Sequence, residues 1–112
     1  MKRIKLSKLQ VEMREWAKEN CPWEVSWQTQ LIGMAEELGE ISHATLKWSQ
    51  KARGWDEEKM RVAVKDGTAD LVIFMMNFCS CLGINLENAI AETAEEVLKR
   101  DWNKFPFDGK SK

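Results

Sequence analysis

Five carboxylates lie at helical spacings inside the two most apolar stretches of this 112-residue chain. Glu36, Glu37 and Glu40 belong to the first stretch, and Asp66 and Asp70 belong to the second. Residues three or four apart share one face of a helix, so each set can point its side chains in one direction. Because buried charges are costly unless they are paired or bind a metal, the pattern indicates either a solvated acidic face or a metal site. Oxygen ligands without histidine or thiolate favour Mg²⁺ or Mn²⁺.

The elements that must position these side chains are four helices, predicted from the spacing of apolar residues and from N-cap signals. We expect them from Ser7 to about Lys18, from an N-cap at Ser26 to about Ser49, from an N-cap at Asp56 to about Cys81, and from an N-cap at Asn85 to about Leu98. No pair of strand-like segments competes with this interpretation. Four helices with short connections predict an all-α four-helix bundle.

The second predicted helix has an apolar stripe with spacings of three and four, which is typical of a helix that packs along another. The stripe consists of Leu31, Met34, Leu38, Ile41, Thr45 and Trp48. Glu37 flanks it, which predicts a position at the edge of the interface. Gly33 and Gly39 each cost up to about 1 kcal/mol of helix propensity, so we expect another backbone to approach closely. The third helix is apolar nearly all round from Leu71 to Phe78, which predicts that it is central and buried.

Length and composition are those of a single domain that spans residues 1–112. The formal net charge of −1 gives no global attraction to a nucleic acid polymer or a membrane. The three cysteines form no even set and lack zinc-ligand spacing, so we expect free thiols. The basic start at Met1 to Leu6 precedes no apolar signal-peptide core, and the longest apolar run is too short to span a bilayer. We therefore expect a soluble, cytoplasmic protein.

Several further residues have the chemistry to contact a phosphorylated aromatic ligand. Lys47, Lys51 and Arg53 follow the acidic helix and can neutralise phosphates, although each is equally typical of a solvated surface. Trp27 lies ten residues before Glu37, roughly 15 Å along a helix, and can stack on a base or serve as a packing anchor. Asn77 lies two turns after Asp70 and can reach a sugar or base, or be a satisfied core amide. His43 is expected to be structural.

The pattern Glu36-Glu37-x-x-Glu40, followed by Asp66-Gly67-x-x-Asp70 in an apolar helix, resembles the MazG-like nucleotide pyrophosphohydrolases. That family belongs to the all-α NTP pyrophosphohydrolases. The resemblance covers nearly the whole chain, including its ending Lys99-Arg100-Asp101-Trp102-x-Lys104-Phe105-Pro106. It implies cleavage of nucleoside triphosphates between the α and β phosphates with Mg²⁺, as nucleotide-pool house-cleaning. It also implies a homodimer or a dimer-of-dimers tetramer with sites completed at the interface.

The resemblance implies metal ligands at Glu37, Glu40 and Asp70, with Glu36 beside them. Glu36 or Glu37 is the candidate base that activates the attacking water. The second motif departs from the family, which usually has a glutamate at the position of Gly67. Asp66 lies four residues before Asp70 and is the candidate replacement as fourth ligand.

A second interpretation belongs to a different class of protein. The chain would then be a non-catalytic helical interaction module, antitoxin-like or for oligomerisation, with its carboxylates on a solvated surface. The placement of the carboxylates separates the two interpretations, because an interaction module has no need of acids inside apolar stripes.

Overall fold

The computed structural model describes residues 2–22 and 26–110, which form four α-helices and contain no strand. The helices are α1 (Leu6–Asn20), α2 (Trp27–Ser49), α3 (Glu57–Cys81) and α4 (Leu86–Leu98). All four begin and end within two residues of the predicted positions. The all-α class is confirmed, and the tail after α4 is non-helical.

Three of the helices begin at the predicted N-caps. A side-chain oxygen accepts a hydrogen bond from the backbone N–H three residues later at Ser26 (3.2 Å), Asp56 (2.8 Å) and Asn85 (3.0 Å). Helix α1 begins at Leu6, one residue before the predicted start, and Ser7 lies inside the helix and does not cap it. Its backbone N–H instead donates to the carboxylate of Glu87 in α4 at 3.0 Å, so a contact distant in sequence replaces the local cap.

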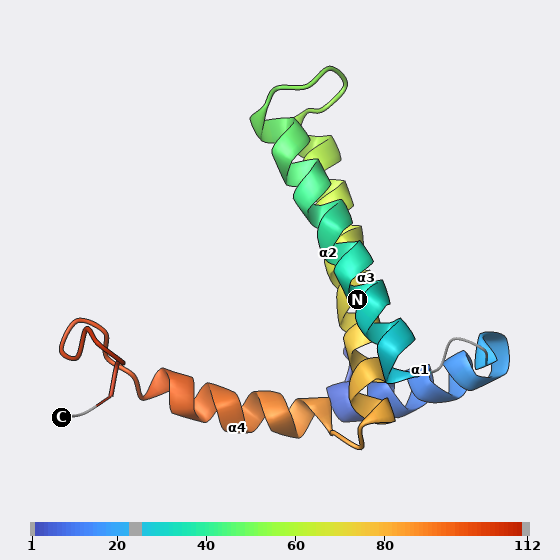
Figure 1. The fold of residues 1–112 in the computed structure, drawn as a ribbon, viewed down its shortest axis with the longest axis vertical. Helices are drawn as coiled ribbons and strands as arrows, with labels where there is room; N and C mark the ends of the chain where they lie inside the picture. The colour runs from blue at the N-terminus through green and yellow to red at the C-terminus, as the bar shows by residue number, and fades with distance from the viewer. Residues whose placement is uncertain (1, 23–25, 111–112) are drawn as a thin grey trace.

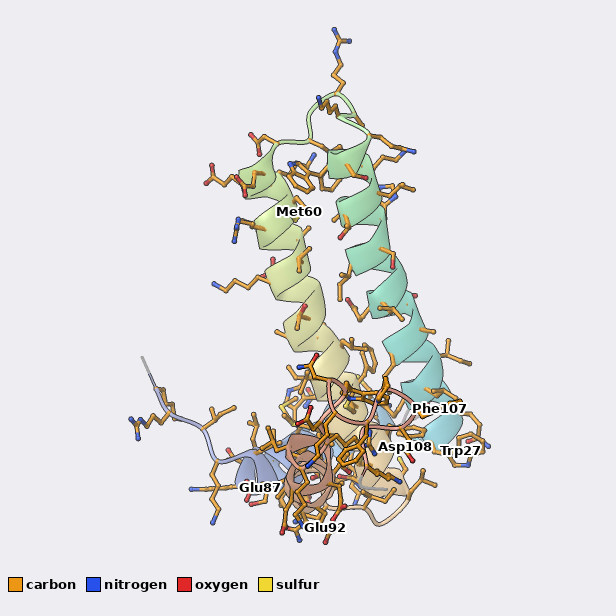
Figure 2. All side chains as sticks on the ribbon, turned by 90° about the vertical axis from the view of Figure 1, so that its left-hand side faces the viewer. Trp27, Met60, Glu87, Glu92, Phe107 and Asp108 are labelled. Carbon is orange, nitrogen blue, oxygen red and sulfur yellow. The ribbon has the colours of Figure 1, made fainter. Side chains whose placement is uncertain are left out.

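The helices form an extended arrangement (Figure 1). Helices α2 and α3 pack side by side as an antiparallel hairpin, from Trp27 at one end to Met60 near the other (Figure 2). Helix α1 crosses the open end of this hairpin and contacts α3, while α4 leaves α3 at 103° and contacts α1. The radius of gyration is 17.7 Å, whereas a compact domain of about 100 residues has about 13 Å. Within the described residues, the four helices of one chain therefore do not surround a common core.

The junction of α1, α3 and α4 contains a small core and a fully bonded buried side chain. Met76, Cys79 and Leu86 are its buried apolar members. Gln10 donates to the Ser80 hydroxyl at 3.0 Å and to the Ile84 carbonyl at 2.8 Å, and it accepts from the Leu86 N–H at 2.9 Å. These three hydrogen bonds hold α1 to the turn that redirects the chain into α4.

The packing face of α2 differs from the prediction. Gln30, Glu37 and Ala44 are its buried residues, whereas Leu31 and Leu38 from the predicted stripe are 44% and 55% exposed. Seven-residue spacing is retained, but the face that contacts α3 is rotated by one residue. Glu37, predicted at the edge of the interface, therefore lies within it.

At two glycines of the α2–α3 interface, a side chain of the other helix lies close. A Cβ at Gly33 would overlap the Phe74 ring, and a Cβ at Gly67 would lie 2.7 Å from Cγ1 of Ile41. The atoms nearest to Gly33 therefore belong to a side chain, whereas the prediction was the approach of another backbone. At Gly39, apart from its chain neighbours and its own helix backbone, no described atom lies within 4 Å of that Cβ position. The large side chains of Phe74 and Ile41 occupy the space that the glycines leave.

Helix α3 is central in its contacts but only half-buried over most of its apolar half. It packs against both α1 and α2, and Met76, Asn77 and Cys79 are buried. Residues 71–75 are half-buried, so the prediction of an entirely buried helix is too strong for one chain. In the described part of the chain, no single helix is long and apolar enough to cross a membrane. Only α3 and α4 taken together, as a pair bent by 103°, have that length and composition.

Candidate functional site

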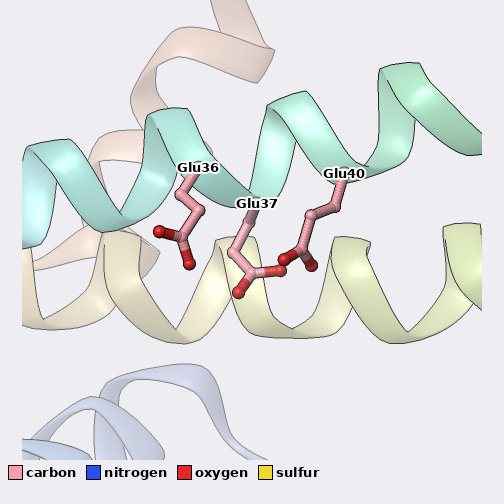
Figure 3. Close-up of side chains that lie close together, drawn as sticks. All are labelled: Glu36, Glu37 and Glu40. Atoms are coloured by element: carbon pink, nitrogen blue, oxygen red, sulfur yellow. The ribbon is translucent and has the colours of Figure 1, made fainter.

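Three glutamates converge on one side of the α2–α3 hairpin. One carboxylate oxygen each from Glu36, Glu37 and Glu40 lies within 4.8 Å of the other two. Figure 3 shows the three side chains descending from α2 toward α3. The spacing of one, three and four residues places them on adjoining parts of one helix face, as the sequence predicted.

Glu37 is the central member of this group. It is only 9% exposed, and its Oε2 atom has no hydrogen-bond partner among the described residues. Burial raises the pKa of Glu37 above its ordinary value, and the negative charges of Glu40, Asp70 and Glu36 and a hydrogen bond with Glu40 raise it further. The fold therefore holds a carboxylate where its charge is costly.

Cations do not compensate this charge within the described part of the chain. The ion pairs there join Arg61 to Glu57, and Lys99 to Glu95 and Glu96. None of them includes a carboxylate of the group around Glu37. A buried carboxylate beside other negative charges is stabilised either by protonation or by a positive partner such as a divalent cation.

The second acidic motif contributes unequally. Both aspartates are exposed, but Asp70 lies close enough to raise the pKa of Glu37, whereas Asp66 is not among the residues that do so. Gly67, between them in sequence, is buried against Ile41. A glutamate at position 67 would have to displace that side chain, so the local packing accommodates glycine. Asp70 is near enough to Glu37 to act on its pKa but is not one of the three converging carboxylates, and ligand roles for Asp70 and Asp66 both stay predictions.

A pocket of about 300 Å³ lies where α1 crosses the hairpin, and none of the three converging glutamates lines it. Its lining is mostly apolar and consists of Met13, Trp16, Ala17, Cys21, Gln30, Asp70, Ile73, Phe74 and Asn77. Asp70 belongs to this wall and also lies beside Glu37, so it connects the pocket to the acidic group. Asn77 is 4% exposed, and its Oδ1 atom has no partner among the described residues.

The other predicted ligand contacts lie apart from this pocket. Trp27 is 43% exposed at the start of α2 and does not line it. Lys47 is half-buried near the end of α2, ten residues and about 15 Å from Glu37 along the helix. Lys51 and Arg53 are exposed in the connection at the hairpin tip, still farther along. One chain therefore does not bring these last two cations to the carboxylates.

Sequence reasoning missed the aromatic walls of the pocket. Trp16 lies in the first predicted helix and Phe74 in the apolar half of the third, and only the crossing of α1 over the hairpin reveals that they border a pocket. Near the hairpin tip, His43 packs edge-on against Trp55 with ring centroids 5.9 Å apart, and Lys59 lies over the same ring. His43 is not part of the carboxylate group. No protein-family model matches the chain, and no curated protein sequence matches it.

Proposed function

We propose that the protein is a Mg²⁺-dependent nucleoside triphosphate pyrophosphohydrolase. It would hydrolyse (d)NTPs between the α and β phosphates to a monophosphate and pyrophosphate, and so remove surplus or non-standard nucleotides. The observation that carries the proposal is the buried Glu37, without an ion-pair partner in the described residues, in a carboxylate group near Asp70, which lines a mostly apolar pocket. Hydrolysis of a nucleotide needs both parts, a cation site for the phosphates and a cavity for the nucleoside.

The donor set fits Mg²⁺. Glu37, Glu40 and Asp70 would supply hard oxygen ligands. The Oε2 atom of Glu37 has no hydrogen-bond partner in the described residues and could coordinate the cation. Mn²⁺ accepts the same ligands. When bound, the metal supplies neutralisation of phosphate oxygens and a more acidic water. Asp66 is retained as a proposed fourth ligand.

Glu36 is the better of the two candidate bases. Its side chain is exposed, whereas Glu37 is buried and committed to the cation site. An exposed carboxylate beside the ligands can accept the proton of an attacking water and pass it to solvent. Glu37 would then position the cation, and Glu36 would do the proton transfer.

The substrate would lie along the hairpin. The nucleoside occupies the pocket near Asn77, and the α-phosphate lies at Asp70 and Glu37. The remaining phosphates extend toward Lys47. This arrangement moves the proposed base contact from Trp27 to the pocket walls. Lys51 and Arg53 are proposed phosphate contacts only if the tip of a second copy approaches.

We also propose that two copies complete the bundle, as a homodimer or a dimer-of-dimers tetramer of the all-α NTP pyrophosphohydrolase type. Leu31 and Leu38 form an exposed apolar row, and at about 100° per residue Leu38 lies about 160–200° round α2 from Glu36 and Glu40. Two hairpins joined through this row would form four packed helices and leave the carboxylates open. Light scattering should give at least twice the chain mass, and Leu38→Glu should reduce it. A wild-type monomer at micromolar concentration would contradict this.

Pyrophosphate release from a panel of NTPs and dNTPs with Mg²⁺ tests the activity. Glu37→Gln and Asp70→Asn should abolish turnover, while Glu92→Gln, an exposed acid on α4, serves as the matched control. No release from any nucleotide would overturn the proposal and favour the non-catalytic interaction module. Turnover that survives both substitutions would show that the activity comes from elsewhere.

A further inference from the structure

The half-buried side chain of Phe74 borders two cavities of the α2–α3 hairpin. One is the pocket of about 300 Å³ where α1 crosses the hairpin, called here the crossing pocket. The other is a second cavity of about 350 Å³, lined from α2 by Thr29, Gln30, Ile32, Gly33 and Glu36. Asp70 lines the crossing pocket and Glu36 lines the second cavity. Phe74 is therefore a wall shared by two cavities that reach different carboxylates.

The absence of a side chain at Gly33 allows the Phe74 ring to occupy this place. A Cβ at Gly33 would overlap three atoms of the ring. Because packed interiors do not absorb such an overlap, an alanine at this position would force the ring to move. Gly33 lines the second cavity but not the crossing pocket. We therefore expect the displaced ring to move away from the second cavity and to narrow the crossing pocket.

The crossing pocket is small for a ligand site. Its volume of about 300 Å³ lies at the lower limit for such sites. Its walls are chiefly apolar, and the faces of Trp16 and Phe74 can stack on a base of any kind. Walls of this kind discriminate by size, and one methylene more or less in a close-fitting apolar pocket changes selectivity about 10–200-fold. A base with additional fused rings would have to displace the Phe74 ring.

We infer that Phe74, seated on Gly33, limits the size of the base that the site accepts, so that nucleotides with a one-ring base are preferred to those with fused-ring bases. This size limit rests on the proposed function, because that function places the nucleoside in the crossing pocket. A shorter side chain at position 74 would join the two cavities and admit larger bases. Gly33 is a positioning residue, since it acts on the ligand only through the ring.

Calorimetric titration with three monophosphates of increasing base size tests the size limit without requiring turnover. These are dCMP, dAMP and the etheno derivative of dAMP, whose bases have one, two and three rings. The full chain with Mg²⁺ should bind dCMP at least about tenfold more tightly than etheno-dAMP, with dAMP between them. In Phe74→Leu this preference should fall at least about fivefold, because the wall is shorter.

Variants at Gly33 test the positioning role. Gly33→Ala should increase the preference for dCMP, because the displaced ring narrows the pocket. Adding Phe74→Leu to Gly33→Ala should return the preference to that of Phe74→Leu alone, since the ring that the Cβ would displace is absent. Gly39→Ala, on the same helix with no described atom within 4 Å of its Cβ position, should retain the wild-type preference. Melting temperatures establish that each variant is folded.

The outcomes separate the size limit from the catalytic proposal. Equal wild-type affinity for dCMP and etheno-dAMP overturns the size limit, as does undetectable binding of all three nucleotides or a preference that survives in Phe74→Leu. Pyrophosphate release without a size preference leaves the catalytic proposal intact and removes the size limit. A size preference that depends on Phe74, without pyrophosphate release, supports the size limit and removes the activity. If Gly33→Ala fails to fold, Phe74→Leu, which creates no overlap, decides the result.

Discussion

Buried polar groups occur in two regions of the molecule and are treated in opposite ways. At the junction of α1, α3 and α4, the Gln10 carboxamide makes three hydrogen bonds that join distant segments. On the α2–α3 hairpin, Glu37 and Asn77 each retain a buried oxygen without a partner in the described structure. Unsatisfied buried groups are costly. The fold avoids this cost at the junction of α1, α3 and α4 but bears it on the α2–α3 hairpin. The satisfied group has a structural role, and the unsatisfied groups are the basis of the proposed ligand site.

The largest expected effect is on activity when Glu37 is neutralised. Glu37→Gln should lower kcat/KM for Mg²⁺-dependent pyrophosphate release by more than about a hundredfold, the upper range for residues that merely support metal ligands. Without metal, the Glu37→Gln variant should be no less stable than wild type, because the substitution removes a costly buried charge. Pyrophosphate release and thermal unfolding in EDTA measure the two effects. A large loss of stability with normal activity would assign Glu37 to the same class as Gln10.

Gln10 should show the reverse behaviour. Gln10→Ala leaves the Ile84 carbonyl and the Leu86 N–H without their partner, at a cost of about 1–3 kcal/mol. A domain of this size should melt roughly 4–8 °C lower for each kcal/mol lost. Mg²⁺ affinity per folded molecule should be unchanged. Denaturant unfolding and metal titration check this, with the exposed Gln28→Ala as control. A selective loss of Mg²⁺ affinity would show that the two regions are not independent.

The raised pKa of Glu37 predicts how the stability of the metal-free protein depends on pH. Between its ordinary and raised pKa values, the folded state holds a proton that the unfolded chain has released. Stability must therefore fall as pH rises through this window. Melting temperatures in EDTA should decline with pH more steeply for wild type than for Glu37→Gln. Mg²⁺ should reverse the decline in wild type alone, since metal binding requires the deprotonated ligand. If the melting temperatures of wild type and Glu37→Gln change with pH in parallel, Glu37 is not the group responsible for the pH dependence.

The extent to which the sequence predicted the molecule depends on how local each feature is. Ser26, Asp56 and Asn85 act within one turn, so their helix starts followed directly from residue type. The face of α2 did not follow, because hydrophobicity favours burying Leu31 and Leu38, whereas the buried residues of this helix are Gln30, Glu37 and Ala44. The carboxylate group was predictable from spacing along one helix. Its adjoining pocket was not, because that depends on where α1 crosses α3.

Two glycine substitutions give the smallest expected effects. They compare the exposed side of α2, at Gly39, with the side that packs on α3, at Gly67 of that helix. Gly39→Ala meets no described atom within 4 Å and should stabilise the protein by up to about 1 kcal/mol through helix propensity. Gly67→Ala gains the same propensity but must displace Ile41, whose Cγ1 would lie 2.7 Å away. Denaturant unfolding should therefore show a lower free energy of unfolding for Gly67→Ala than for Gly39→Ala. Titration with Mg²⁺ should show a weaker affinity only for Gly67→Ala. If Gly39→Ala instead destabilises the protein or lowers its light-scattering mass, a second copy must approach α2 closely at that position.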